Sequence, residues 1–228
     1  MWQAATVVAI KNETRNAKTF RFALAEPSRH LAGQHYVVRL TAPDGYTAAR
    51  SYSVASAPDG SNEFELTVER LEGGEVSTFL HDVVVIGDEL EVQGPIGGWF
   101  VWTADAPALL VGGGSGLVPL IAMLRLARRT QNSHLVRLVV SVRSASDLYY
   151  AAELHGPEVN VVYTREAPSS SGRPPGRLTG ADIRQPLVPD ATAYVCGAPG
   201  FADAASELLV GLGQPLHRIR VERFGPTG

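Results

Sequence analysis

The stretch Leu109-Leu110-Val111-Gly112-Gly113-Gly114-Ser115-Gly116-Leu117-Val118-Pro119 predicts a buried strand that turns through a glycine-rich loop into a helix. The apolar run before the glycines is typical of a parallel strand, and the apolar spacing from Leu117 to Leu124 is typical of a helix packed on a sheet. Because glycine has no Cβ atom, a ligand can approach this backbone closely, and a helix N-terminus attracts anions. The residues expected to bind a phosphate are Gly113, Gly114, Ser115, Gly116 and Pro119.

The loop matches neither of two common phosphate-binding patterns. It lacks the third glycine of G-x-G-x-x-G, because Leu117 or Pro119 stands at that position. It is not a P-loop, because no Lys follows the glycines. A tight structural turn and the adenosylmethionine loop of a methyltransferase stay open as alternatives.

The composition is that of a soluble globular chain. Its 228 residues, 45% hydrophobic and 19% charged, suffice for one large domain or two of ordinary size. No apolar run approaches the roughly 18 to 20 residues of a membrane span. Because Met1-Trp2-Gln3 leads directly into strand-like sequence, we expect no signal peptide and a cytoplasmic location.

Charge and cysteine count exclude several classes of function. A net charge of -3 gives no reason to expect nucleic-acid binding. The single Cys196 excludes an intramolecular disulfide, a Cys-based zinc site and an iron–sulfur cluster with four thiolate ligands within these 228 residues. The six His residues lack the short spacing of metal ligands, so no metal site is expected.

Short apolar alternations separated by turn residues fill the N-terminal part of the chain. Regular turn signals such as Pro43-Asp44-Gly45 predict an antiparallel barrel or sandwich. One short helix is expected from Glu75 to Leu80, with Val76, Phe79 and Leu80 facing inward. The strands are expected at residues 6–10, 19–24, 35–40, 63–70 and 89–92.

Strands and helices alternate after Asp105-Ala106-Pro107, which predicts a parallel α/β sheet. We therefore expect two domains, an antiparallel β-barrel over residues 1–104 and an α/β domain over residues 105–228. The Ser- and Pro-rich stretch 168–175 offers nothing to bury and is expected to be a mobile loop. The expected strands are 108–111, 135–142, 159–163 and 193–196, and the expected helices are 117–129, 146–153 and 201–212.

A second stretch, Arg50-Ser51-Tyr52-Ser53, places a cation, an aromatic ring and hydroxyl groups on one strand at the edge of the expected barrel. These groups suit a phosphate, a flat ring and a ring heteroatom. An ordinary polar strand with a surface Arg50 and a half-buried Tyr52 is the alternative interpretation.

This second stretch resembles the flavin-binding Arg-x-Tyr-Ser motif of the ferredoxin-NADP reductase superfamily. Five further stretches match the family in the same order, so the resemblance spans nearly the whole chain. It implies a flavin-binding Greek-key β-barrel followed by an α/β domain that binds a nicotinamide coenzyme. The five stretches are Gly33-Gln34, residues 73–78, Gly94-Pro95-Ile96-Gly97, the glycine loop after Val111, and Val195-Cys196-Gly197-Ala198-Pro199-Gly200.

The resemblance implies how a flavin would be held. Tyr52 would lie against the flavin ring, Ser53 would hydrogen-bond near flavin N5, and Arg50 would pair with the flavin phosphate. Ser51 and Val68 are also expected to contact the flavin cofactor.

A second segment of the family pattern favours FAD over FMN. Gly74, Val76 and Ser77 would meet the FAD pyrophosphate at the start of the short helix, which suits the N–H groups of a helix N-terminus. A Ser77 that serves only as a helix N-cap is the alternative.

Arginines after the second and third strands of the parallel sheet indicate the coenzyme. Arg143-Ser144 stands where NAD-preferring folds carry an acidic residue. Arg165 and Arg177 occupy places where bacterial NADPH-using relatives carry phosphate-binding arginines. Three cations around one 2′-phosphate would favour NADPH through charge-assisted hydrogen bonds. Taken singly, each arginine also fits a solvated surface charge.

Cys196 ends a buried strand at the sheet edge where open α/β sheets bind ligands. With Gly197 and Pro199 it resembles the family's Cys-Gly-x-Pro loop, whose Cys lies near nicotinamide C4 and would position the ring rather than attack it. Simple packing is the other interpretation of a lone buried Cys. The family's usual Met after this loop is replaced by Phe201.

The C-terminus carries two further candidates. Phe224 would stack on the flavin face, as the terminal aromatic residue of many relatives does, although four residues follow it in this sequence. Glu222 would be the carboxylate that in some relatives neighbours the flavin-site Ser53. A terminal strand with Val221 and Phe224 buried is equally compatible with the pattern.

The resemblance therefore implies an FAD-dependent oxidoreductase that transfers hydride from NADPH to FAD and then electrons to a separate acceptor such as ferredoxin, acting as a monomer. Ser53, Cys196 and Glu222 are the expected catalytic residues. The alternatives are an NADH-dependent reductase component of an oxygenase, a siderophore-type ferric reductase and a nucleotide-binding regulatory module. A methyltransferase would not account for the barrel, the Arg50–Ser53 stretch or the three arginines.

Overall fold

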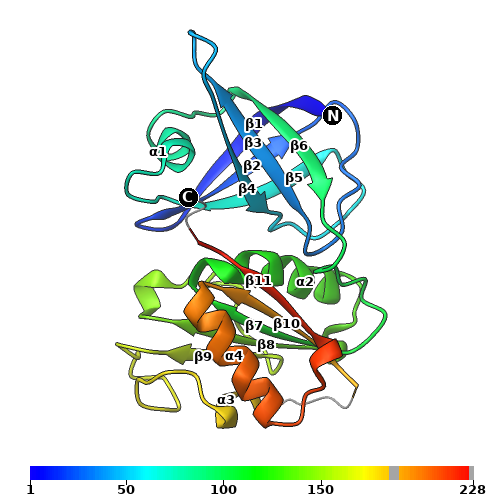
Figure 1. Cartoon of the computed structure of the whole chain (residues 1–228), viewed down its shortest axis with the longest axis vertical. Helices are drawn as coiled ribbons and strands as arrows, with labels where there is room; N and C mark the ends of the chain where they lie inside the picture. The colour runs from blue at the N-terminus through cyan, green and yellow to red at the C-terminus, as the bar shows by residue number, and fades with distance from the viewer. Residues whose placement is uncertain (185–189, 226–228) are drawn as a thin grey trace. The chain divides into compact units, whose positions relative to one another are not determined.

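The computed structural model describes residues 1–184 and 190–225. It divides into two compact units, Met1–Val101 and Trp102–Gly228, which Figure 1 shows in one view. The division falls after Val101, whereas we expected it after residue 104. The three intervening residues belong to the second unit, where the Trp102 indole donates a hydrogen bond to the Ala106 carbonyl at 2.9 Å.

The N-terminal unit is one antiparallel sheet of six strands in the order β4-β3-β6-β1-β2-β5. Its two edge strands, β4 and β5, meet through an antiparallel bridge between Val54 and Leu66, which closes the sheet. The expected antiparallel barrel is therefore confirmed. The strands are β1 Trp2–Thr14, β2 Ala17–Ala23, β3 His35–Thr41, β4 Thr47–Ser53, β5 Glu63–Glu69 and β6 Glu89–Ile96.

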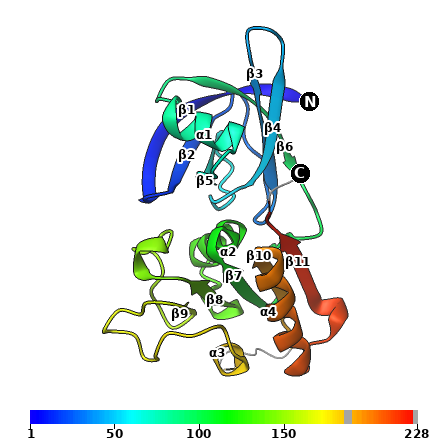
Figure 2. The same ribbon diagram turned by 60° about the vertical axis from the view of Figure 1, so that its left-hand side comes forward.

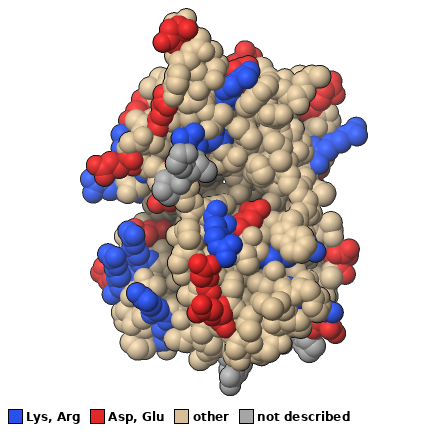
Figure 3. All heavy atoms as spheres, in the orientation of Figure 1, with Lys and Arg blue, Asp and Glu red and all other residues tan. Residues whose placement is uncertain are grey.

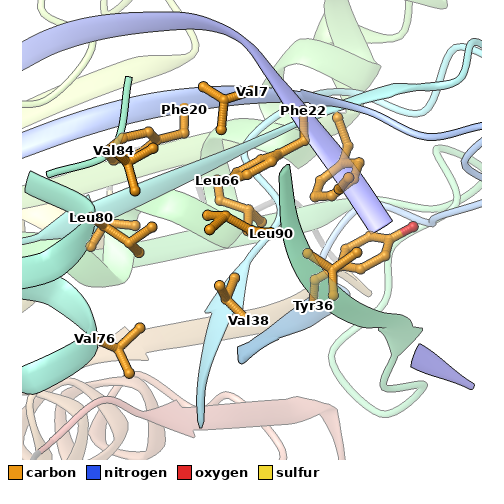
Figure 4. Close-up of a cluster of buried hydrophobic side chains, with 14 of the residues drawn as sticks. Val7, Phe20, Phe22, Tyr36, Val38, Leu66, Val76, Leu80, Val84 and Leu90 are labelled. Carbon is orange, nitrogen blue, oxygen red and sulfur yellow. The ribbon is translucent and has the colours of Figure 1, made fainter. Parts of the chain in front are cut away.

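Alternation along the strands separates a core face from a solvent face. In β2, Phe20 and Phe22 are buried, while Arg21 between them is exposed and pairs with Glu65 of β5 at 2.9 Å. Figure 4 shows Phe20 and Phe22 pointing into a cluster with Leu66. Each such buried side chain stabilises the fold by about 1.5 to 3 kcal/mol, so this cluster fixes the register of the barrel.

Helix α1, Glu75–Asp82, packs beside strands β4 and β5. Val76 and Leu80 are buried in the barrel core, as expected, and Figure 4 shows both reaching in from the helix. The expectation that Phe79 also faces inward is wrong, since it is 38% exposed. The buried face of α1 instead includes Ser77 and His81, and residue 79 falls on the opposite side of a helix with 3.6 residues per turn.

The C-terminal unit is a parallel sheet of five strands in the order β11-β10-β7-β8-β9. If β7 is numbered 1 and the later strands follow in chain order, the order across the sheet is 3-2-1-4-5, which is that of a doubly wound nucleotide-binding fold. The strand order reverses between β7 and β10. The expected parallel α/β sheet is confirmed. Its strands are β7 Ala108–Gly113, β8 Val136–Val142, β9 Val159–Tyr163, β10 Thr192–Gly197 and β11 Ile219–Arg223, and its helices are α2 Leu117–Arg129, α3 Gly180–Arg184 and α4 Pro199–Gly211.

Helices α2 and α4 cover opposite faces of this sheet. Leu109 and Val111 pack in one apolar cluster with Ala205 and Leu209 of α4. Gly112 lies on the other face, because side chains alternate along a strand, and a Cβ there would meet Leu120 of α2 at 3.0 Å. Figure 2 shows both helices from a second side.

The helix expected over residues 146–153 does not form. A short 3₁₀ turn at Ala145–Asp147 is followed by turns in which Tyr150, 1% exposed, has a φ of 55° that a helix does not allow. Arg125 of α2 holds this segment in place, because its guanidinium donates two hydrogen bonds to the Glu153 carboxylate at 2.8 and 2.6 Å. Tertiary contacts of Arg125 and Tyr150 therefore override the local apolar pattern.

Residues 1–184 and 190–225 contain no helix that is both long enough and apolar enough to cross a membrane. In the same ranges, no group of three or more His, Cys, Asp or Glu side chains is arranged to hold a metal ion.

Candidate functional site

The carboxyl ends of β7 and β10 form the switch point of the parallel sheet. The two strands are paired with Val111 opposite Val195 and Gly112 opposite Cys196. Ligands of open α/β sheets bind outside the strand ends at such a point. The glycine loop follows β7 and the Cys196–Pro199 stretch follows β10, so two of the predicted motifs lie at the position where this fold binds ligands.

The glycines of the loop serve different purposes. A Cβ at Gly116 would collide with the Cys196 carbonyl, and one at Gly113 would lie 2.6 Å from the ring of Phe201. These two glycines are therefore required by packing. Gly114 is exposed, has a φ of 55°, and has open space where a Cβ would point, so its bare backbone faces solvent.

This loop suits a pyrophosphate. Gly114–Gly116 forms a 3₁₀ turn that leads directly into α2, so the loop is continuous with a helix N-terminus. Ser115 is half-buried, and Pro119 is buried in the first turn of α2, where the missing N–H of proline matters little. The loop therefore fits a diphosphate through its backbone rather than through side chains.

Cys196 is fully buried and lies opposite Glu222 of β11 in the strand register. Burial raises the pKa of the Cys196 thiol well above its ordinary value, and the charge of Glu222 raises it further. Burial likewise raises the pKa of Glu222 to about 7. A thiol with such a pKa stays protonated near neutral pH, which suits a positioning role and not a nucleophilic one.

The C-terminal tail continues from β11 along the end of β10. The Phe224 backbone N–H donates to the Gly197 carbonyl at 2.8 Å, and the Phe224 and Val221 side chains are half-buried. Pro199 is exposed at the start of α4. Cys196, Gly197 and Glu222 are thus brought together at one end of the sheet.

Two of the predicted arginines, Arg143 and Arg165, follow the neighbouring strands β8 and β9, and the third, Arg177, lies in the loop between β9 and α3. The Arg165 N–H donates to the Arg143 carbonyl at 3.0 Å, and the Gly176 N–H, next to Arg177, donates to the Tyr163 carbonyl at 3.0 Å. All three arginine side chains are exposed, and none of their guanidinium groups pairs with a residue that the structure describes. In the face drawn in Figure 3, basic side chains gather at the left-hand edge of the C-terminal unit. The backbone therefore groups three unpaired cations.

Ser144 forms side-chain hydrogen bonds that were not predicted. Its hydroxyl donates to the Asp147 carboxylate at 2.6 Å and lies 2.8 Å from the Ser146 hydroxyl. An acidic group therefore stands near the end of β8 after all. The Ser-x-x-Asp spacing is that of a capping box and was the available signal.

In the N-terminal unit, the Arg50–Ser53 stretch occupies the edge strand β4. Tyr52 lies opposite Tyr36, is half-buried, and has a pKa raised to about 12, mainly through burial. Ser53 is 6% exposed, and Ser51 is exposed. The exposed Arg50 guanidinium donates to the Ala49 carbonyl at 2.8 Å and pairs with no acidic group among the described residues. A free cation, a tyrosine ring and a hydroxyl on one strand fit a flavin phosphate and ring.

The N-terminus of α1 lies beside this strand. The Tyr46 hydroxyl, from the β3–β4 connection, donates to the Glu75 carboxylate at 3.1 Å. The first intrahelical bond runs from Thr78 N–H to the Gly74 carbonyl, so within the described chain the N–H groups of Glu75, Val76 and Ser77 have no acceptor. Three free N–H groups at a helix N-terminus fit a pyrophosphate.

Three of the predicted FAD contacts, Ser77, Val68 and Val76, have buried side chains. Ser77 is not the N-cap, since Gly74 occupies that position; the Ser77 hydroxyl donates to the Gly74 carbonyl at 3.2 Å. Val68 is 1% exposed in the barrel core, and its carbonyl accepts a hydrogen bond from the His81 ring at 2.9 Å. Val68 and Val76 therefore offer no exposed side chain to a ligand.

Gln34 links three segments that lie far apart in the sequence: its own Gly33-Gln34 stretch, the end of the Arg50–Ser53 stretch and the Gly94–Gly97 stretch. Its side-chain amide donates to the Gly97 carbonyl at 2.6 Å and accepts from the Leu31 N–H at 2.7 Å. The backbone carbonyl of Gln34 accepts a hydrogen bond at 2.9 Å from the N–H of Val54, the residue after Ser53. Gln34 thus joins the ends of β4 and β6, a role that no sequence motif predicts.

Comparison with known proteins agrees with these two units. The oxidoreductase FAD-binding domain family matches residues 4–101, and the oxidoreductase NAD-binding domain family matches residues 110–207. The ferredoxin–NAD(P)(+) reductase component of the naphthalene 1,2-dioxygenase/salicylate 5-hydroxylase systems of Ralstonia sp is 32% identical over 98% of this chain and 69% of its own length. The Pseudomonas putida flavohemoprotein is 31% identical, and the match covers 86% of this chain and 51% of that protein.

Solved structures show the same fold. The FAD/NAD-binding domain of a Vibrio cholerae nitric oxide dioxygenase superposes with a TM-score of 0.87 and 26% identity, covering 98% of this chain and 99% of that one. The Amycolatopsis cytochrome P450 reductase gives a TM-score of 0.83 and 29% identity, covering 100% of this chain and 71% of the other. The chain belongs to the ferredoxin-NADP reductase superfamily and is a flavoprotein oxidoreductase with an FAD-binding and an NAD(P)-binding domain.

Proposed function

We propose that this chain is an NADPH-dependent reductase that passes electrons through FAD to a separate redox protein. The observation that carries the choice of coenzyme is a group of three exposed arginines whose guanidinium groups pair with no described residue: Arg143 and Arg165 after β8 and β9, and Arg177 in the loop that follows β9. A 2′-phosphate is a dianion near neutral pH, and arginine forms directed, charge-assisted hydrogen bonds with phosphate oxygens.

FAD would be held by the N-terminal unit. The Arg50 guanidinium and the free N–H groups at the start of α1 would bind the phosphates, through the backbone at Gly74, Val76 and Ser77. Tyr52 would lie along the flavin ring, and the Ser53 hydroxyl would hydrogen-bond to it. Bound FAD takes up a hydride from a nicotinamide coenzyme and can release electrons one at a time.

The C-terminal unit would hold the coenzyme. The backbone of Gly113–Gly116 would bind the pyrophosphate at the switch point. Cys196 would keep a neutral, buried thiol next to the site and so exclude water and fix the position of the nicotinamide ring. Glu222, with a pKa of about 7, would hold a proton on its carboxyl group below about pH 7. These residues contribute positioning and proton storage, which is most of what hydride transfer demands of a protein.

A separate acceptor is proposed because the one Cys of these 228 residues cannot ligate an iron–sulfur cluster. Similar proteins named as reductase components belong to naphthalene dioxygenase and propane monooxygenase systems. These names support a partner that is itself a redox protein.

The test is anaerobic stopped-flow reduction of the bound flavin with NADPH and with NADH. We expect the dissociation constant for NADPH to be at least about tenfold lower than that for NADH, since each well-made arginine–phosphate contact contributes about 1.4 kcal/mol or more. Equal constants for the two coenzymes would overturn the assignment of NADPH.

A second candidate is an NADH-dependent reductase component of an oxygenase. Asp147, held by Ser144 close after β8, is the observation that favours it, because an acidic residue there accepts the ribose hydroxyls of NADH and repels a 2′-phosphate. The same stopped-flow comparison separates the two candidates, as tighter binding of NADH would select this one.

A further inference from the structure

The loop between β9 and α3 is built from polar contacts and not from an apolar core. Its Ser- and Pro-rich sequence has little to bury, yet the Ser171 N–H donates to the Pro168 carbonyl at 2.8 Å. The Ser171 hydroxyl donates to the Arg173 carbonyl at 3.0 Å. The loop carries Arg177, one of the three arginines proposed to bind the 2′-phosphate.

Asp182 is the centre of these contacts. One of its carboxylate oxygens, Oδ2, accepts hydrogen bonds from the Thr179 N–H at 2.8 Å, the Thr179 hydroxyl at 2.7 Å and the Arg173 guanidinium at 2.5 Å. The Asp182 side chain is only 9% exposed. Burial raises its pKa, but the hydrogen bonds from Thr179 and Arg173 outweigh this and hold the pKa below the ordinary value. The carboxylate is therefore charged, and its Oδ2 atom binds three donors within the loop.

Arg173 extends the network to the residue of interest. While one of its nitrogens binds Asp182, the other donates to the Arg177 carbonyl at 3.2 Å. On the other side, the Gly176 N–H is bonded to the Tyr163 carbonyl at the end of β9. The backbone of Arg177 is thus fixed on both sides, while its guanidinium stays exposed and unpaired with any described residue.

We propose that Asp182 is a positioning residue for coenzyme selection, which holds Arg177, through Arg173 and Thr179, where its guanidinium meets the 2′-phosphate of NADPH. The inference rests on the proposed preference for NADPH. Its physical basis is preorganisation, because a cation on a fixed backbone loses less freedom on binding than one on a loose loop.

The sign of one substitution separates positioning from plain electrostatics. Asp182→Asn removes a negative charge near the arginines, so a purely electrostatic role predicts tighter binding of a phosphate. The positioning role predicts weaker binding, because Arg173 loses its charged partner and the Arg177 backbone is released.

The experiment is isothermal titration calorimetry of the full chain with adenosine 2′,5′-bisphosphate and with adenosine 5′-monophosphate, which lacks the 2′-phosphate. We expect Asp182→Asn to weaken binding of the bisphosphate about tenfold and to leave binding of the monophosphate unchanged. Thr179→Val, which removes one donor to Asp182, is expected to weaken bisphosphate binding about threefold. The charge-matched control is Asp203→Asn, because it also removes one carboxylate, which lies on α4 and pairs with Arg223 of β11 at 2.6 Å. It is expected to change binding of neither the bisphosphate nor the monophosphate.

Each outcome decides a different point. If the unaltered protein binds the bisphosphate no more tightly than the monophosphate, the proposed NADPH preference fails and this inference falls with it. If the preference is present but Asp182→Asn and Thr179→Val both keep it, or if Asp182→Asn binds the bisphosphate more tightly, only the positioning role of Asp182 is overturned. Unchanged monophosphate binding shows that the variants are folded.

Discussion

Cys196 and Glu222 lie opposite each other on the neighbouring parallel strands β10 and β11. The thiol is fully buried, and the carboxyl group is half-buried. Burial is the first cause of the raised pKa of both groups. The sheet therefore keeps two proton-bearing groups together next to the switch point, and the ionisation of Glu222 is coupled to the stability of the fold.

Replacing Glu222 with Gln should change how stability depends on pH. The pKa of Glu222 in the folded state, about 7, lies above its ordinary value of 4.5, so the folded state binds more protons than the unfolded state between these pH values. Stability contributed by the neutral carboxyl is therefore present below about pH 4.5 and is lost as the pH rises through about 7. The free energy of unfolding is measured with urea at pH 5 and pH 8. Between these pH values the stability of Glu222→Gln, relative to that of the unaltered protein, should rise by about 2 kcal/mol, a value reduced for the partial exposure of Glu222.

Glu207→Gln on α4 is the matched control, because Glu207 is exposed. It should shift stability by the same small amount at both pH values. A Glu222→Gln variant that behaves like this control would show that Glu222 is not held in its neutral form.

Gly116 should tolerate no side chain. A Cβ there would collide with the backbone carbonyl of Cys196, and backbone cannot rotate away as a side chain can. We expect Gly116→Ala to destabilise the protein by at least about 2 kcal/mol in thermal or urea unfolding. Gly200→Ala is the control, since a Cβ there meets nothing within 4 Å and its position lies in α4, where Ala is favoured. Equal stabilities of the two variants would mean that the glycine loop and the end of β10 are not as close together as the structure places them.

The sequence could predict most of the fold because local signals and tertiary packing agree. The apolar alternation of β2 and the apolar run of β7 specify one strand each, and the 117–129 helix has the bounds that were expected. Where they disagree, packing decides. Residues 146–153 have a helical pattern, but the buried Tyr150 and the ion pair from Arg125 to Glu153 impose turns.

The candidate site was predictable only where its residues follow strands. Arg143 directly follows β8 and Arg165 lies two residues after the end of β9, so their proximity follows from a parallel sheet. Gln34 bonds to Gly97, 63 residues away, and Asp182 bonds to Arg173, and neither contact follows a recognised sequence spacing. Sequence therefore places residues that follow strands better than it identifies residues that hold others in position through side-chain contacts.

Arg143 and Asp147 should have opposite effects on coenzyme choice. Arg143→Ala removes an unpaired cation, so we expect the KM for NADPH to rise about tenfold while the KM for NADH stays within about twofold. Asp147→Asn removes the carboxylate that Ser144 binds and should lower the KM for NADPH, because repulsion of the 2′-phosphate disappears. Steady-state kinetics with both coenzymes measures the two ratios. Parallel changes for NADPH and NADH in either variant would contradict a contact with the 2′-phosphate.

His30 should make the N-terminal unit less stable in mild acid. Its ring is 2% exposed, with Nδ1 2.8 Å from the Ser28 hydroxyl and Nε2 3.2 Å from the Ser56 carbonyl, and Ser28 is in turn 3.1 Å from the Tyr36 hydroxyl. Burial lowers the pKa of His30 below 6.5, against smaller opposing effects of the Ser56 hydrogen bond and the Asp59 charge.

The unfolded state therefore binds more protons than the folded state just below pH 6.5, so the stability that a neutral His30 contributes is present above that pH and declines as the pH falls. At pH 8, His30→Gln should lower the free energy of unfolding by about 1 to 3 kcal/mol, because the network loses a partner. Between pH 8 and pH 5.5, the variant should lose less stability than the unaltered protein does. Urea unfolding of both proteins at the two pH values, with the exposed His134→Gln as control, measures this difference. The same pH dependence in His30→Gln as in the unaltered protein would show that the Ser28–His30–Tyr36 network does not control acid stability.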